Sequence, residues 1–493
     1  MEKASSSSAP ANATKLTLGQ STDMPVPSFQ LFGATIETAA ASSAAASDIS
    51  AAATAASQNA TIADATQGQD SLSLSLQPAA LSAPTMGPPA SRSNIAVERA
   101  AALRGHLRRC VEALATARSA DADAELASVM RLASADGDAA QRMAVAFAEA
   151  LARVAIRPWR GVSAALFATH DADNDGSPAV ASEARHNFLA VCPLLRLAAV
   201  AVNELILDAT RHDKLIHIVD IGGVNHSQWM ELIAFLGSRW QGRPTSLRLT
   251  VVIKEPKEFY SQAATMLTDE ATRHRLPSFE LDVVESSLEA LKMDDLGVRT
   301  DHAVVIVSTL QLHRLVGTRS IASSSSSSVP VSASSLADDL LRGFHRVSPR
   351  IIIITENEAR HFGPGFRERF VLALDYYEQL FCSMEEASLF CQPAERKAVE
   401  RHFLKEEIKD IIACEDGPQW ARHEPLDRWI ARMGAVGFVF WPMSIVLAAG
   451  RVRSVAAKLP SGGHGYRVTE GDGWLILNRM NKPMFSVSVW TKK

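Results

Sequence analysis

A short stretch near the middle of the chain carries residues that could bind a nucleotide. A buried apolar run ends in Asp220, and Gly222 and Gly223 follow after Ile221. This pattern is typical of the turn that binds the cofactor in methyltransferases and dehydrogenases, because glycines let a ligand approach the next helix N-terminus. The fingerprint lacks a third glycine, and Lys254 stands where an acidic partner for a ribose is expected, although Glu255 is adjacent. An S-adenosylmethionine-dependent small-molecule methyltransferase is therefore the enzymatic alternative.

Other polar residues near predicted strands favour structural roles. His217 alternates with isoleucines in a strand buried on both faces, which indicates a hydrogen-bonded core histidine, and Asn225 is placed to cap the following helix. Glu356, Glu358 and His361 follow another strand end, where a polar crevice lining is a simpler interpretation than acid–base catalysis. No Ser/His/Asp arrangement and no metal-ligand spacing stands out. We predict no catalytic, cofactor-binding or metal-binding residues.

The elements that position these residues alternate between strand and helix, which predicts a doubly wound, mainly parallel α/β sheet. Two later apolar segments, 473–478 and 484–490, predict a hairpin at the sheet edge that turns at Met480 to Pro483. The alternating elements are strand 215–220, helix 227–239, strand 247–253, helix 257–273, and strands 279–284, 303–308 and 350–355.

Helical spacing dominates the chain before and after this sheet. From about Ala96 to Thr210 apolar residues recur with a helical period, which predicts a bundle that ends in one helix over 185–210. Residues 364–390 and 395–435 are again helical by the same criterion. A leucine stripe in the first helix forms either an internal core or a dimerisation face. Its members are Leu103, Leu107 and Leu114.

Residues 1–95 differ in composition from the rest. Ser, Ala, Thr and Pro dominate, and such a segment buries too little apolar area to offset its ordering entropy, so we predict a disordered tail. Within it Leu72, Leu74 and Leu76 lie on alternate residues, all on one face of an extended segment. They could dock as a strand into a groove of a partner, or reflect a Ser/Leu-biased tract.

Length and composition set the remaining bounds. The 493 residues are 47% hydrophobic with a formal net charge of −4, and the five cysteines include no C-x-x-C pair. No run reaches the ~18 apolar residues that a membrane span needs, so we expect no membrane contact. Without a global basic field, DNA contact is expected to be indirect, or confined to a local patch such as Arg367/Arg369 or Arg451/Arg453.

Several separate stretches resemble the motifs of the plant GRAS-domain transcriptional regulators, in the right order from about Glu98 to Lys493. Leucine-rich segments before and after the central strand resemble the two leucine heptad regions of that family. The central strand is similar to its VHIID motif, and other residues to its PFYRE and SAW motifs. The VHIID-like residues are Ile216, His217, Ile218, Val219 and Asp220; the PFYRE-like residues are Pro349, Tyr376, Tyr377, Glu406 and Glu407; the SAW-like residues are Ser488, Val489 and Trp490.

Within the family, three stretches are similar to the scarecrow-like 3 branch: 132–138, 309–313 and 405–412. The resemblance implies a Rossmann-type, methyltransferase-like core (about 211–493) under an N-terminal helical cap (about 96–210). It also implies a nuclear, non-enzymatic regulator without cofactor, acting in gibberellin signalling and root development. Members pair with other GRAS proteins through the first leucine-rich helices and are tethered to promoters by zinc-finger factors. In this context the L-x-L-x-L segment resembles an amphiphilic repression motif that recruits a corepressor.

Overall fold

The protein was analysed as a computed structural model. The chain divides into two compact units, Met1–Ala83 and Pro84–Lys493, and every described residue belongs to the second. Residues 1–88 of the predicted tail, with the L-x-L-x-L segment, and the serine run at 323–328 lie outside the described residues, whereas 89–95, predicted to be disordered, begin the first helix. The structure describes residues 89–173, 178–222, 225–239, 242–316, 335–362, 365–387, 391–414, 421–441 and 445–493.

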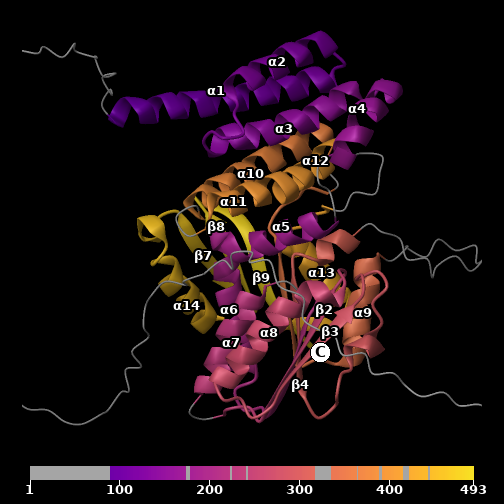
Figure 1. The fold of residues 1–493 in the computed structure, drawn as a ribbon, viewed down its shortest axis with the longest axis vertical. Coiled ribbons are helices and arrows are strands. Elements are labelled where there is room, and N and C mark those ends of the chain that lie inside the picture. The colour runs from indigo at the N-terminus through magenta and orange to yellow at the C-terminus, as the bar shows by residue number, and fades with distance from the viewer. Residues whose placement is uncertain are drawn as a thin grey trace, which may run out of the picture. The chain divides into compact units, whose positions relative to one another are not determined.

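The folded unit combines one mixed sheet with a layer of helices (Figure 1). The strands are β1 Leu215–Asp220, β2 Ser246–Ile253, β3 Phe279–Glu285, β4 Ala303–Thr309, β5 Ile351–Asn357, β6 Phe438–Phe440, β7 Tyr466–Gly471, β8 Trp474–Arg479 and β9 Lys482–Lys492. The helices are α1 Pro89–Ala115, α2 Ser119–Leu132, α3 Ala139–Ile156, α4 Arg160–Asp173, α5 Pro178–Val191, α6 Pro193–Ala209, α7 His226–Ser238, α8 Ser261–Arg273, α9 Leu336–Val347, α10 Phe366–Ala387, α11 Pro393–Val399, α12 Lys405–Ala413, α13 Leu426–Val436 and α14 Val446–Ala456.

The sheet has the order β3-β2-β1-β4-β5-β9-β8-β7, with β6 pairing to β9. Strands β1 to β5 are parallel to one another, while β9 runs antiparallel to β5. Their β-branched side chains fill both faces: Val305 and Val307 belong to one hydrophobic core, and Val304 and Ile306 to the other. The predicted doubly wound, Rossmann-type fold is confirmed, and β1 to β5 begin and end within two residues of the predicted bounds.

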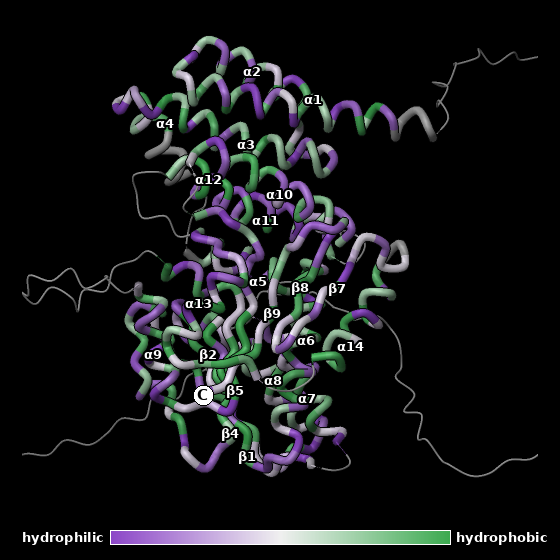
Figure 2. Tube along the Cα trace, turned by 180° about the vertical axis from the view of Figure 1, so that it is seen from behind, coloured by the Kyte–Doolittle hydropathy of each residue, from purple (hydrophilic) through white to green (hydrophobic). Residues whose placement is uncertain are grey.

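Helices cover both faces of this sheet. The first core joins the sheet to α6, α7 and α8, and the second joins it to α9 and α13. Figure 1 shows these two groups on opposite sides of the strands, and Figure 2 shows β4 and β5 between them as largely hydrophobic. Such two-sided burial is what near-continuous apolar strands require.

The antiparallel end of the sheet differs from the prediction. The expected hairpin exists as β8 and β9, but it turns at Met480 and Asn481, both with positive φ, and Pro483 already pairs with Asn478 inside the ladder. Strand β9 lies between β5 and β8, so the sheet edge is β7, which was not predicted. Strand β7 alternates polar with apolar residues and therefore lacks the apolar run by which the other strands were predicted.

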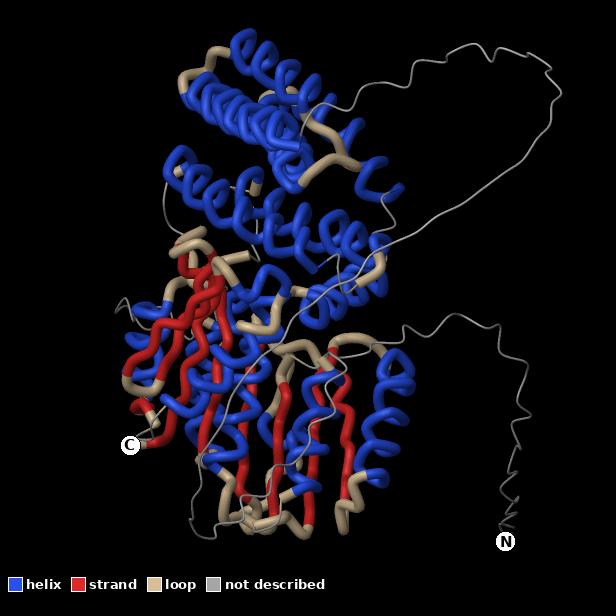
Figure 3. Tube along the Cα trace, turned by 90° about the vertical axis from the view of Figure 1, so that its left-hand side faces the viewer, coloured by secondary structure: helices blue, strands red, loops and turns tan. Residues whose placement is uncertain are grey.

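The helical layer over the sheet is drawn from two parts of the chain. Helices α10 and α12, which follow β5, pack against α3, so the cap is not confined to residues 96–210 as expected. Phe147 of α3 meets Phe370 of α10 edge to face at 5.5 Å between ring centroids. Figure 3 shows this helical layer beyond one end of the strands. We use "cap" below for α1 to α4 together with α10 to α12.

The predicted single helix over 185–210 is broken. Helix α5 ends at Val191 and α6 begins with Pro193 at its first position, because proline cannot donate to the preceding turn but fits a helix start. Among the described residues no single helix is long and apolar enough to span a bilayer; α5 and α6 pass that test only together, as a pair bent by 72°.

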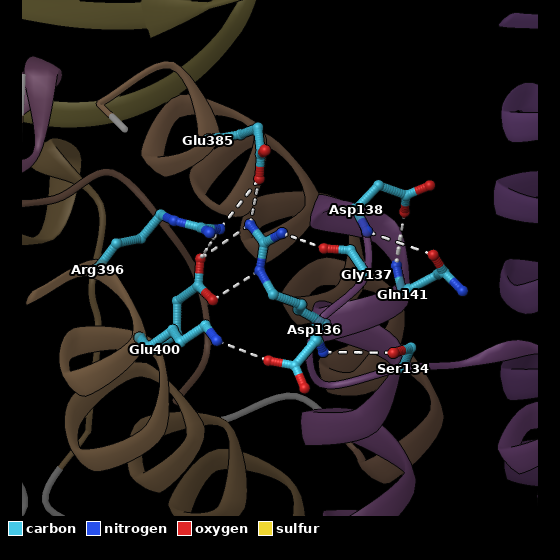
Figure 4. Close-up of polar contacts among 10 residues, drawn as sticks. Ser134, Asp136, Gly137, Asp138, Gln141, Glu385, Arg396 and Glu400 are labelled. Carbon is cyan, nitrogen blue, oxygen red and sulfur yellow. Dashed lines mark hydrogen bonds and ion pairs between the residues drawn. The ribbon is translucent and has the colours of Figure 1, made fainter. Parts of the chain in front are cut away.

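A buried arginine, Arg142, joins the two parts of the cap, and Figure 4 labels its partners Gly137, Glu385 and Glu400. Arg142 of α3 donates from Nε to Glu400 at 2.7 Å, from Nη1 to the Gly137 carbonyl at 2.5 Å, and also contacts Glu385. The loop before α3 is fixed locally, since Asp138 caps the helix and accepts from the Gln141 N–H at 3.0 Å. The stretch 132–138 therefore forms the junction between α2, α3 and the later helices.

Candidate functional site

The turn after β1 is closed by its own side chains. Asp220 accepts from the Gly222 N–H and from the indole N–H of Trp229, both at 2.8 Å. Asn225 caps α7 by accepting from the Gln228 N–H at 3.4 Å. The carboxylate that a cofactor turn would offer to a ligand is thus engaged inside the protein.

His217 is also held internally. Its Nε2 lies 2.8 Å from the Thr250 hydroxyl on β2, and the side chain is fully buried. Burial, together with the positive charge of Arg248, lowers the pKa of His217 to about 4. A neutral histidine in this position is a packing and hydrogen-bonding residue at neutral pH.

A crevice of about 890 Å³ lies beside this turn, between the carboxyl ends of the strands and helices α5 and α12. Parallel sheets bind ligands at this edge, where the strand order reverses between β1 and β4. Arg185 of α5 crosses the crevice and donates to the carbonyls of Gly222 and Thr309, both at 3.0 Å. Burial and the nearby Arg314 lower the pKa of Arg185 to about 10.

The PFYRE-like residues do not form one site. Tyr377 of α10 donates to Glu407 of α12 at 2.9 Å, and Tyr376 donates to Asn357 at the end of β5 at 2.7 Å. Glu406 lines the crevice. Pro349 precedes β5, at the opposite end of that strand.

The SAW-like residues form part of the sheet. Ser488, Val489 and Trp490 lie in β9 and pair with β5. The Trp490 indole donates to the Ser488 hydroxyl at 2.9 Å and stacks on Phe440 at 4.0 Å between ring centroids. Trp490 and Val489 face opposite cores, which is a structural arrangement.

A group of buried histidines and glutamates beneath the crevice was not recognised as a unit from the sequence. His313 lies 2.7 Å from Glu356 through Nδ1, and the Nδ1 atoms of His361 and His423 lie 2.9 Å apart. Glu356 and His361 were expected to line a crevice, whereas both are buried. Because β4 and β5 are neighbours, polar residues after their ends meet, and this signal could have linked His313 with Glu356.

The leucine stripe of α1 faces inward. Leu103 and Leu107 are fully buried in the core, and Leu114 packs against it, so the structure assigns the stripe to the chain's own interior. Exposed apolar side chains of the cap include Ile95 and Val97 of α1 and Met130 of α2. A further group is formed by Trp159, Val162 and Leu166, which are 60%, 49% and 54% exposed. The last two lie on α4, and Trp159 directly precedes it.

These features define a class of protein: a Rossmann-type sheet under a helical cap, with the cofactor turn bonded to its own side chains. Residues 103–491 match the GRAS domain family, and the chain belongs to that family. The resemblance inferred from the motifs is thereby confirmed.

Similar proteins of known type support this family assignment. The chain is 30% identical over 429 residues to Scarecrow-like protein 3 of Arabidopsis thaliana, covering 77% of this chain and 87% of that protein. It is 30% identical to DELLA protein RGL3 of Arabidopsis thaliana, covering 77% and 67%. The crystal structure of SCL7 in Oryza sativa matches with a TM-score of 0.62 at 29% identity, covering 79% of this chain and 99% of that one. Relatives of these types are plant transcriptional regulators in gibberellin signalling and development, rather than enzymes.

Proposed function

We propose that this chain is a nuclear, non-enzymatic transcriptional cofactor in gibberellin signalling and root development. It acts through protein contacts with other GRAS proteins and with zinc-finger factors that bind DNA. The observation that carries the proposal is the closed turn, in which Asp220 is bonded to Trp229 and Gly222. A sheet whose ligand turn is engaged internally serves as a rigid platform for partners.

Pairing with a second GRAS chain is assigned to the outer face of α4. Trp159, Val162 and Leu166 follow the spacing i, i+3, i+7, which places them along one side of a helix. Large apolar side chains gathered on an exposed helix face mark protein interfaces. Leu103 and Leu107 cannot serve this role without unfolding the cap, since both are buried.

DNA contact is proposed to be indirect. The arginine pairs that could form a local basic patch are engaged within the chain: Arg367 pairs with Glu112 at 2.8 Å, and Arg453 with Glu470 at 2.9 Å. Arg369 donates to the Ile411 carbonyl at 2.8 Å. Gel shifts with the purified protein should show no binding even at low salt; a shift that weakens as salt rises would indicate a direct contact.

Affinity capture from plant nuclei followed by mass spectrometry tests the main proposal. It should recover GRAS and zinc-finger proteins, and a fusion tethered to a promoter should change reporter output. Absence of both partner classes together with an inert tethered fusion would contradict the proposal.

The L-x-L-x-L segment lies outside the described residues, and corepressor recruitment is proposed for it from sequence. Changing Leu72, Leu74 and Leu76 to Ala should abolish repression by a tethered fusion and leave the thermal stability of the folded unit unchanged. Changing the serines Ser71, Ser73 and Ser75 to Ala is the matched control. Unchanged repression in the leucine variant would assign the segment to compositional bias.

The crevice keeps one alternative function open to test, an S-adenosylmethionine-dependent small-molecule methyltransferase. Its volume of about 890 Å³ suits a cofactor-sized ligand. If the chain is a transcriptional regulator without enzymatic activity, calorimetry should show no binding of S-adenosylmethionine. Micromolar binding that is lost in Gly223→Trp would favour the methyltransferase.

A further inference from the structure

Five buried ionisable side chains lie beneath the crevice and have no role in the proposed function. They are His313, Glu356, His361, Glu407 and His423, and none is more than 4% exposed. They come from different parts of the chain: the turn after β4, the end of β5 and the loop after it, α12, and the segment before α13. We call them the histidine cluster.

Each of the three histidines has a buried ring nitrogen without a hydrogen-bond partner among the described residues, and those of His313 and His423 lie nearest Glu407. Nδ1 of His313 lies 2.7 Å from the Glu356 carboxylate, and Nδ1 of His423 lies 2.9 Å from Nδ1 of His361. Nε2 of His313 and of His423 has no hydrogen-bond partner among the described residues, although both atoms are buried. Buried polar atoms are normally paired, so these ring nitrogens are available to bind a ligand.

The same pattern is the one that metal-binding histidines adopt. Such a histidine binds the ion through one nitrogen while a carboxylate or another polar group holds the second nitrogen and fixes the ring. His313 with Glu356 reproduces this arrangement, and His423 is held in the same way by His361. The backbone N–H of His361 also donates to the His423 carbonyl at 3.2 Å, which ties the two loops together.

Glu407 supplies a third ligand. One of its oxygens accepts from the Tyr377 hydroxyl at 2.9 Å, which orients the carboxylate. The other lies 3.6 Å from Nε2 of His423, beyond hydrogen-bond distance. One ligand atom each from His313, Glu407 and His423 lie within 4.8 Å of one another.

Two carboxylates lie beside the histidines, while the positive charges of Arg314 and Arg185 lie close enough to act on His313. The ion pairs of Glu356 and Glu407 among the described residues are formed with histidines only, and no Lys or Arg pairs with either carboxylate there. Buried carboxylates are stable when paired or when they bind a metal ion. His313 lines the crevice, which gives an ion a route from solvent.

We propose that His313, Glu407 and His423 bind a divalent transition-metal ion, with Zn²⁺ as the ion that this two-histidine, one-carboxylate set suits best. Tetrahedral Zn²⁺ with bonds of about 2.0–2.1 Å holds its ligand atoms roughly 3.3 Å apart. Binding therefore draws the three side chains together and links α12, the turn after β4 and the segment before α13.

The test uses the full-length chain, stripped with a chelator and reloaded with Zn²⁺ alone. Elemental analysis should find one zinc per chain after desalting, and thermal unfolding should shift upward on loading. Co²⁺ in place of Zn²⁺ should give the visible absorption of a tetrahedral site. His313→Gln and Glu407→Gln should lose both the stoichiometric metal and the spectrum, whereas His212→Gln, a change of an exposed histidine, should keep them.

The wild-type chain decides the matter even if the variants fold poorly. Substoichiometric zinc with no shift in the unfolding temperature of the wild type would overturn the proposal. The histidine cluster would then bind protons only. Stoichiometric metal that persists in folded His313→Gln would overturn the assignment of the ligands.

Discussion

The indole nitrogen of Trp229 lies 2.8 Å from Oδ2 of Asp220, so the first helix after β1 is bonded to the end of the strand that precedes it. Both side chains are buried. The bond fixes the strand, turn and helix as one unit at the edge where α/β proteins of this type bind ligands.

Trp229→Phe should therefore destabilise the protein by about 1–3 kcal/mol, because it leaves a buried carboxylate oxygen without its donor. Urea unfolding followed by circular dichroism measures the change. Trp159→Phe is the matched control, since Trp159 is 60% exposed, and it should leave the midpoint unchanged. Equal midpoints for the two variants would contradict the structural role of the Asp220 bond.

Arg142→Met should cost about 1–3 kcal/mol, because Glu400 loses its bond to Arg142 and keeps only the longer contact with Arg396 at 3.4 Å. Exposed pairs contribute little, so Arg118→Met, which removes the pair with Asp121, should change the unfolding midpoint only slightly. The measurement is the denaturant midpoint of each variant. A small effect of Arg142→Met would show that the two parts of the cap are joined mainly by apolar packing.

His217 predicts a specific dependence of stability on pH. Its pKa in the folded chain, about 4, lies below the usual value of 6.5, so the unfolded chain binds more protons between these values. The contribution of neutral His217 to the free energy of unfolding is complete above about pH 6.5. It is lost as the pH falls toward 4, by up to about 3 kcal/mol.

The comparison of wild type with His217→Asn isolates this contribution, since Glu356 titrates in the opposite sense. Burial raises the pKa of Glu356 to about 7, so its part favours the folded state at low pH and is lost as the pH rises. The difference in unfolding free energy between wild type and His217→Asn should shrink from pH 7 to pH 4. A difference that stays constant would rule out a depressed pKa.

We predict that a change on the outer face of α4 weakens pairing between chains without changing the stability of the fold. Leu166→Glu should weaken self-association or pairing with another GRAS chain by at least tenfold, with an unchanged melting temperature, because Leu166 is 54% exposed. Leu103→Ala should instead cost about 2–5 kcal/mol of stability, since that side chain is buried. Sedimentation over a range of concentrations measures the first effect and thermal unfolding the second; normal pairing by Leu166→Glu would exclude α4.

The parallel strands could be predicted because they are short apolar runs with both faces buried, as in β4 and β5. Strand β7 could not, since it is a polar edge strand whose place depends on pairing with β8. The composition of the cap could not be predicted from local sequence patterns either. Helix α3 packs against α10 and α12, which are more than 200 residues later in the chain.

The roles of polar residues could likewise be predicted only where the local sequence pattern determines them. His217 was expected to form an internal hydrogen bond because β1 is buried on both faces, and Asn225 was expected to cap the following helix; both do so. The inward direction of Leu103 was left open, because a helical stripe does not reveal which partner covers it. His423 had no local signal, since its neighbours in the histidine cluster come from segments brought together only by the fold.

Strand β9 has a consequence for how the protein is made. It follows all the other strands in sequence, yet it lies inside the sheet, hydrogen-bonded to both β5 and β8. A ribosome must therefore release residues up to about Lys492 from its exit tunnel before the sheet can close. Until then β5 presents an open apolar edge to the cytosol. A premature stop codon only a dozen positions upstream should thus leave a nascent product for chaperones and proteases, rather than a slightly shortened regulator.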